Sequence, residues 1–220
     1  MTTTERLLQA SAPVWDTYHD HPFVRGMQDG TLEEEKFRYY IMQDYLYLIE
    51  YAKVFAVGIA KSSRLDVMQL FTFYIQAIIN GEMDIHNGYM GKLHIQQSEL
   101  DAMPISLDNR SYTAYMISVA YAGGEAETMA AILSCALSYE AIAKHMVECN
   151  PACVDNPLYG DWVRGYISDR YHHNNEVLVD MIERLTADYN EAQLQNLEDI
   201  FVTCSHYEKC FWDMAWEMRK

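Results

Sequence analysis

The chain has 220 residues, half of them hydrophobic, and its 32 acidic against 16 basic side chains give a formal net charge of −16. A chain of this length and composition can bury a large core and shows no segment typical of disorder. A surface this acidic repels phosphate backbones and anionic lipids, so the charge argues against nucleic-acid and membrane-surface binding, and the apolar runs are too short to span a membrane.

Helical periodicity covers most of the chain, so we predict one all-α domain over residues 1–220, a helical bundle of about seven or eight helices. A first helix is predicted over about 4–19, followed by the break HPFVRGMQDGT. Thr31 is predicted to N-cap the next, long helix, with Glu34 completing a capping box. A third helix is predicted over about 65–97, before the loop DAMPISLDN.

The second half of the chain continues the helical pattern. A helix over about 111–122 ends at Gly123–Gly124, and the next begins near Glu125 and stops before NPACVDNP, because its prolines forbid continuation. One or two helices cover residues 158–189, with Gly165 as a plausible break. The last helix runs from near Asn190 to the C-terminus.

The N-terminal stretch MTTTERLLQASAP is polar, carries a glutamate and lacks the apolar core of a signal peptide. The five cysteines, at positions 135, 149, 153, 204 and 210, are an odd number without a secretory context. We therefore expect reduced thiols in a cytoplasmic protein.

Cys135 lies in the predicted helix AETMAAILSCALSYEAIAKHM, one turn before Tyr139. A cysteine among Ile, Leu and Ala is more often core packing than a catalyst. A tyrosine hydroxyl on the same face indicates a lined pocket, so the nucleophilic interpretation stays open beside the structural one.

The stretch QDYLYLIEY places Asp44, Tyr47 and Tyr51 on one side of a helix that is apolar almost all round. A carboxylate buried in such a helix must find a partner or a ligand. Spacing alone does not distinguish a ligand-binding aspartate from a structural one bonded to a tyrosine or to Lys36 or Lys53.

In SHYEKCFWDMAW, Glu208 shares a helix face with Phe211 and Trp212. A glutamate packed between aromatic rings has a raised pKa, which suits a general acid or base near neutral pH. A surface glutamate paired with Lys209 or with a neighbouring chain is the alternative.

In NGEMDIHNGY, Glu82 and His86 have the spacing of metal ligands on one helix turn, as in helical di-iron proteins. Four more side chains could complete such a site: Glu140, His172, His173 and Glu176. No Glu-x-x-His pattern repeats, so a hydrogen-bonded structural pair is the simpler interpretation, and we expect no metal.

These segments together resemble the TenA (thiaminase II) family over nearly the whole chain. The resemblance is carried by six blocks in the same order: HPFVRGMQDGTLEEEKFRYYIMQDYLYLIEYAKVFA, EMDIHNGY, SYTAYM, LSCALSYE, YGDWVRGY and SHYEKCFWDMAW. It implies an all-α, haem-oxygenase-like fold without haem or another cofactor, and a homotetramer.

The resemblance also implies the site residues. The catalytic pair would be Cys135 as nucleophile and Glu208 as acid/base. The pyrimidine would be held by Asp44, Tyr47, Tyr112, Tyr139 and Tyr166. The chain departs from the family pattern at His172 and His173, and in having Glu140 five residues after the cysteine with Ala141 at the sixth, where the family commonly has a glutamate.

The implied activity is hydrolysis of an aminopyrimidine in thiamin salvage. The substrate would be 4-amino-5-aminomethyl-2-methylpyrimidine, converted to 4-amino-5-hydroxymethyl-2-methylpyrimidine, or thiamin itself, cleaved to the same pyrimidine and the thiazole. Two alternatives remain: a metal-dependent oxidase of the same architecture, and a non-catalytic regulator, against which the net charge of −16 argues where DNA contact is concerned.

Overall fold

The computed structural model describes residues 1–219, except for the side chains of residues 81–87. Over this range the chain forms eleven α-helices, a π-helical and a 3-10 segment, and no strand. The predicted all-α class is therefore confirmed, whereas the number of helices exceeds the predicted seven or eight. None of the described helices is both long and apolar enough to cross a membrane.

The chain divides into two compact units, each described by itself. The first unit comprises residues 1–32 and 129–212, and the second comprises residues 33–128 and 213–220. Helices α8 (Glu125–Cys149) and α11 (Glu191–Glu217) contribute residues to both units. A single domain over residues 1–220 stays a prediction.

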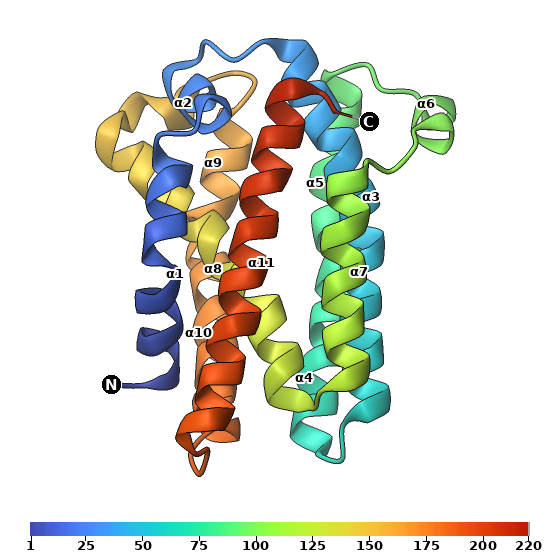
Figure 1. The fold of residues 1–220 in the computed structure, drawn as a ribbon. Coiled ribbons are helices and arrows are strands. Elements are labelled where there is room, and N and C mark those ends of the chain that lie inside the picture. Colours follow the sequence, from blue (N-terminus) through green and yellow to red (C-terminus); the bar gives the residue numbers. More distant parts are fainter. Residues whose placement is uncertain (220) are drawn as a thin grey trace. The chain divides into compact units, whose positions relative to one another are not determined.

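In the first unit, α1 (Thr3–His19) packs against α10 (Asp169–Leu185), and Figure 1 shows these two helices beside α11. The carboxylate of Glu183 on α10 accepts hydrogen bonds from the backbone N–H groups of Thr3, at 3.0 Å, and Thr4, at 2.7 Å. A negative charge there satisfies two donors that a helix start leaves unpaired and complements the helix dipole. The unit also contains α2 (Pro22–Asp29), the 3-10 segment (Pro151–Asp155) and α9 (Gly160–Tyr166).

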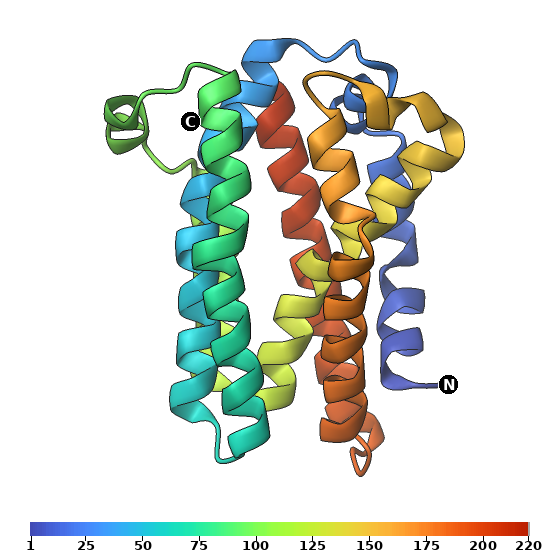
Figure 2. The ribbon, with the colours of Figure 1, turned by 180° about the vertical axis from the view of Figure 1, so that it is seen from behind.

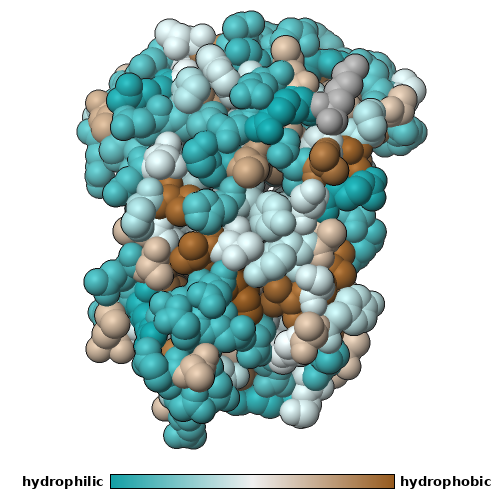
Figure 3. Space-filling view, in the orientation of Figure 1, coloured by the Kyte–Doolittle hydropathy of each residue, from teal (hydrophilic) through white to brown (hydrophobic). Residues whose placement is uncertain are grey.

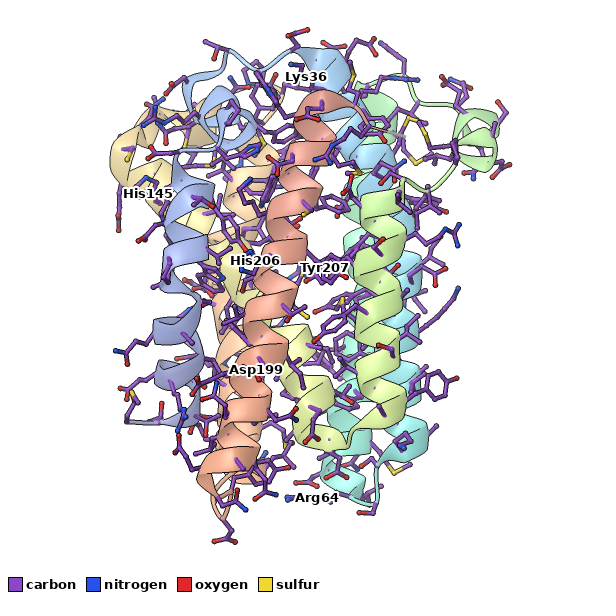
Figure 4. All side chains as sticks on the ribbon, viewed as in Figure 1. Lys36, Arg64, His145, Asp199, His206 and Tyr207 are labelled. Atoms are coloured by element: carbon purple, nitrogen blue, oxygen red, sulfur yellow. The ribbon has the colours of Figure 1, made fainter. Side chains whose placement is uncertain are left out.

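In the second unit, the long helix α3 (Glu34–Lys61) packs against α4 (Leu65–Gln76) and α7 (Leu107–Ala122). Figure 2 shows α3 beside α4 from behind. Gly58 permits the close approach of α4, since a Cβ atom there would lie 2.5 Å from Cε2 of Phe71. Arg64, labelled in Figure 4 at the turn between α3 and α4, pairs with Asp66 at 2.9 Å. The remaining helices of this unit are α5 (Met83–Lys92) and α6 (Gln97–Ala102).

Several helix ends follow from local sequence. Pro22 occupies the first turn of α2, where its missing N–H costs nothing, and Gly30 ends that helix with a left-handed φ of 70°. The prediction that Thr31 caps α3 is wrong, because the N-cap is Glu33. The N–H groups of Thr31 and Leu32 instead donate to the carbonyl of Gly26, so these residues still belong to the end of α2.

The extra helices arise in three places. The prediction that HPFVRGMQDGT breaks regular structure is wrong, because α2 lies within it. The other two places are a predicted long helix that is divided and the start of a predicted loop. The segment 65–97 divides into α4 and α5 at the π-helical stretch Ala77–Glu82. A short helix, α6, precedes the predicted loop and overlaps its start. The break expected at Gly165 occurs directly after it, because α9 ends at Tyr166 and Ser168 caps α10 through the N–H of Tyr171.

Candidate active site

Cys135 lies on α8 in the first unit, one turn before Tyr139, as the helical spacing predicted. Both residues are buried, with 9% of Cys135 and 4% of Tyr139 exposed. All five cysteines lie in the described part of the chain, and none forms a disulfide. Cys135 therefore lies in the buried part of the unit and outside any disulfide.

An aromatic wall surrounds Tyr139 in the same unit. Its ring centroid lies 4.9 Å from that of Tyr166, 5.8 Å from Trp162 and 5.4 Å from Trp212. The two predicted tyrosines are thus brought together from α8 and α9. The two tryptophans were not predicted as site residues, although the blocks YGDWVRGY and SHYEKCFWDMAW contain them. Such rings offer flat apolar surfaces on which a heterocycle can stack.

Glu208 lies on α11 and is 1% exposed, so it is not the surface glutamate of the alternative interpretation. Burial raises the pKa of the Tyr18 hydroxyl and is the largest cause of its shift. The negative charges of Glu208 and of a Cys135 thiolate raise this pKa further. Burial and Glu208 likewise raise the pKa of the Cys204 thiol. Tyr18 on α1 is therefore a residue whose pKa responds to both Glu208 and Cys135.

The remaining predicted residues, Asp44, Tyr47 and Tyr112, lie in the second unit. Asp44 is 5% exposed on α3, one turn before Tyr47. The Tyr47 ring centroid lies 5.5 Å from that of Tyr112 on α7 and 5.3 Å from that of Tyr51. The Tyr47 hydroxyl donates to Sδ of Met116 at 3.8 Å. The structure therefore groups Tyr47 with Tyr112, which the sequence placed on separate helices.

The two lysines considered as structural partners of Asp44 have other partners. Lys53 Nζ lies 2.6 Å from Glu50 Oε1, within the same helix. Lys36, labelled in Figure 4, pairs with Glu33 at 3.4 Å and lies over the ring of Trp216. The structure thus assigns both cations to other groups.

Four polar side chains named for the oxidase alternative line a groove of about 390 Å³ between α8 and α10: Glu140, His172, His173 and Glu176. The buried Glu140 carboxylate accepts a hydrogen bond from Nδ2 of Asn175 at 2.6 Å. It also lies 2.6 Å from Nδ1 of His172 and forms an ion pair with Lys144 at 2.5 Å. Burial alone would raise the pKa of Glu140, but the hydrogen bonds from Lys144, Asn175 and His172 outweigh it and lower the pKa.

No group of three or more His, Cys, Asp or Glu side chains that could hold a metal occurs among the side chains that the structure describes. Glu82 and His86 lie outside those described side chains. The bonds of Glu140 to His172 and Asn175 join α10 to α8.

A second, larger groove of about 930 Å³ lies in the second unit, lined mainly by apolar side chains of α3, α7 and the segment before α7. Figure 3 shows hydrophobic side chains, in brown, over α7 on one face of the molecule. None of the predicted site residues lines this groove.

The family described as TENA/THI-4/PQQC matches residues 8–218 of this chain. An aminopyrimidine aminohydrolase of Helicobacter pylori is 41% identical over 217 residues, covering 99% of this chain and 100% of that protein. An aminopyrimidine aminohydrolase of Halalkalibacterium halodurans is 37% identical, covering 100% of this chain and 97% of that protein.

Solved structures agree in fold. A TenA homologue from P. horikoshii OT3 superposes with a TM-score of 0.89 at 27% identity and covers 99% of each chain. A domain with a haem-oxygenase-like fold from Shewanella denitrificans superposes with a TM-score of 0.79 at 12% identity, covering 98% of this chain and 92% of that one. The predicted haem-oxygenase-like, all-α fold is therefore confirmed.

Proposed function

Because the chain belongs to the TENA/THI-4/PQQC family, we propose that it is a hydrolase of thiamin salvage acting on 4-amino-5-aminomethyl-2-methylpyrimidine. The reaction replaces the amino group of the 5-aminomethyl substituent by a hydroxyl and releases ammonia. The same chemistry on thiamin releases the thiazole. The names of the two bacterial relatives, which match over almost their whole length, support this substrate class.

One observation of this chain carries the proposal. The thiol of Cys135 and the carboxyl group of Glu208 come from α8 and α11, and a 3.0 Å hydrogen bond between the hydroxyls of Ser134 and Ser205 joins these two helices beside them. Cys135 and Glu208 are both buried, so water is largely kept from them. Covalent catalysis at an electron-poor ring requires a nucleophile and a proton donor in a site that excludes water, and two buried groups on joined helices suit that chemistry.

The mechanism follows from the chemistry of the ring. Glu208 gives a proton to a ring nitrogen while the Cys135 thiolate forms a C–S bond to a ring carbon. The ring is then no longer aromatic, and the exocyclic C–N bond breaks, so that the substrate's ammonium group leaves as ammonia and a methylene remains.

The second half of the reaction restores the enzyme. Water adds its oxygen to the methylene and passes a proton to the Glu208 carboxylate. The C–S bond breaks and returns the thiolate, and the ring nitrogen loses its added proton to the released ammonia. The products are the hydroxymethylpyrimidine and ammonium, and Cys135 and Glu208 regain their starting states.

Asp44 is assigned the recognition of the pyrimidine. Its carboxylate can accept two parallel hydrogen bonds from the 4-amino group and a protonated ring nitrogen, an arrangement that gives both affinity and orientation. The tyrosines at 47, 112, 139 and 166 supply stacking faces and hydroxyls. Asp44→Asn should therefore raise KM more than it lowers kcat.

The test is to incubate the purified protein with the aminomethylpyrimidine and with thiamin in parallel, following ammonia and thiazole release. Cys135→Ser and Glu208→Gln should each reduce turnover by at least about 10²-fold, the usual contribution of such groups. Cys149→Ser, which alters an exposed thiol, is the matched control and should keep full activity. A Cys135 variant with near wild-type turnover would refute the assignment.

We propose a homotetramer on the basis of the family resemblance, which sedimentation velocity tests directly. We also propose a cytoplasmic location, because none of the five cysteines forms a disulfide, and cell fractionation tests it.

A further inference from the structure

Hydrogen bonds from two other helices of the first unit, α1 and α8, converge on Ser205 of α11, the residue before His206 in Figure 4. Nε1 of Trp15 donates to Ser205 Oγ at 2.9 Å, and the Tyr18 hydroxyl donates to the Ser205 carbonyl at 2.5 Å. Oγ of Ser134 on α8 lies 3.0 Å from Ser205 Oγ. Ser205 Oγ donates to the Phe201 carbonyl at 2.9 Å.

The direction of these bonds can be deduced. A serine hydroxyl has one proton and two lone pairs. Since the Ser205 proton points to the Phe201 carbonyl, its oxygen accepts from both Trp15 and Ser134. Every position around the Ser205 hydroxyl is then used. Ser134 and Ser205 are both completely buried, so no water competes for these bonds.

The bridge between Ser134 and Ser205 lies directly beside the proposed catalytic pair. Ser134 immediately precedes Cys135, and Ser205 lies one helical turn before Glu208. An α-helix is stiff over one turn, so a bond that fixes α8 at residue 134 and α11 at residue 205 also fixes the distance between the thiol and the carboxyl group. The α1 side chains Trp15 and Tyr18 brace this bridge from a third helix.

We propose that Ser205 is a positioning residue, whose bridge to Ser134 sets the separation of Cys135 and Glu208 for the reaction. This role rests on the proposed function. Misplacement of reacting groups by about 1 Å can cost about 10²-fold in rate, whereas substrate binding depends on other side chains. Loss of the bridge should therefore lower kcat and leave KM nearly unchanged.

The experiment compares wild type, Ser134→Ala, Ser205→Ala and the double variant in steady-state kinetics with the aminomethylpyrimidine. Circular dichroism and thermal unfolding establish that each variant is folded. Ser205→Ala should reduce kcat by about 10- to 100-fold with KM changed less than about twofold. The double variant should be no slower than the slower single variant, because both changes remove the same bridge.

Thr203→Ala is the matched control, because it removes a hydroxyl of α11 that donates only to the carbonyl of Asp199 in its own helix. Should Ser205→Ala fail to fold, Ser134→Ala decides, since it leaves the bonds of Ser205 to Trp15 and Phe201 in place. A wild-type kcat in the folded serine variants, additive losses in the double variant, or an equal loss in Thr203→Ala would overturn the positioning role while the proposed function stands. Failure of the wild type to hydrolyse either substrate would instead refute the proposed function, and the positioning role with it.

Discussion

Replacing Glu140 by alanine should destabilise the protein, because this carboxylate joins α10 to α8. Glu140 is 6% exposed, and Nδ2 of Asn175 donates to its Oε2 at 2.6 Å. Lys144 and His172 complete its contacts, but about half of each of these side chains is exposed. The three contacts therefore differ in strength.

The expected loss of unfolding free energy follows from the unequal strengths of these three contacts. A buried hydrogen bond to a charged group contributes about 1.5–3 kcal/mol, so the Asn175 bond dominates. The contacts with the half-exposed Lys144 and His172 side chains each contribute about 0–1 kcal/mol after solvent screening. Glu140→Ala should thus lower the free energy of unfolding by about 2–4 kcal/mol. At about 2–4 °C per kcal/mol for a chain of this size, Tm should fall by roughly 4–16 °C.

The stability lost in Glu140→Ala should be larger at neutral pH than at acidic pH. Burial opposes the charge on Glu140, but its hydrogen bonds prevail and lower its pKa in the folded state from the ordinary value of 4.5. A carboxyl group with a lowered folded pKa contributes its full stability above the unfolded pKa and loses it as the pH falls through the folded pKa. The difference between wild type and Glu140→Ala should therefore be largest near pH 7 and shrink at about pH 3.5.

Urea unfolding at these two pH values measures the effect. Glu176→Ala is the control, because that carboxylate is 59% exposed and lies 3.7 Å from His172 Nε2. It should change stability by less than about 0.5 kcal/mol. A similarly small loss for Glu140→Ala, or a loss that is equal at both pH values, would show that the buried hydrogen bonds do not stabilise the contact.

Three more predictions concern packing and chemistry. Gly58→Ala should destabilise the second unit by about 1–3 kcal/mol, since the new methyl would displace the Phe71 ring; a rise in Tm would contradict this. Trp162→Ala removes a ring centred 4.6 Å from that of Tyr166, and should cost about 3–5 kcal/mol in thermal unfolding and raise KM; an unchanged KM would remove Trp162 from the substrate site. Treatment with a chelator should leave turnover unchanged, because the proposed steps use only a thiol and a carboxyl group, whereas a loss restored by iron or manganese would favour the oxidase alternative.

Much of the fold was predictable because its signals are local. The first helix was predicted to within one residue of its start, and α8 begins at the predicted Glu125 and ends before the proline-containing loop. The face shared by Cys135 and Tyr139 follows from helical spacing alone. Thr31 was mispredicted because a capping-box pattern is local, whereas the bonds of this residue to Gly26 depend on how the preceding helix ends.

The arrangement of the site depends instead on contacts between residues that are distant in the sequence. The sequence by itself determined the helices, the acidic character, the family resemblance and the residue types available for catalysis. Only the tertiary structure placed Trp162 and Trp212 against Tyr139, and joined Ser134 to Ser205 across 71 residues of sequence. Periodicity reveals which face of a helix is buried, but not which other helix covers it. A contact between distant residues depends on the packing of whole helices, and no local pattern encodes it.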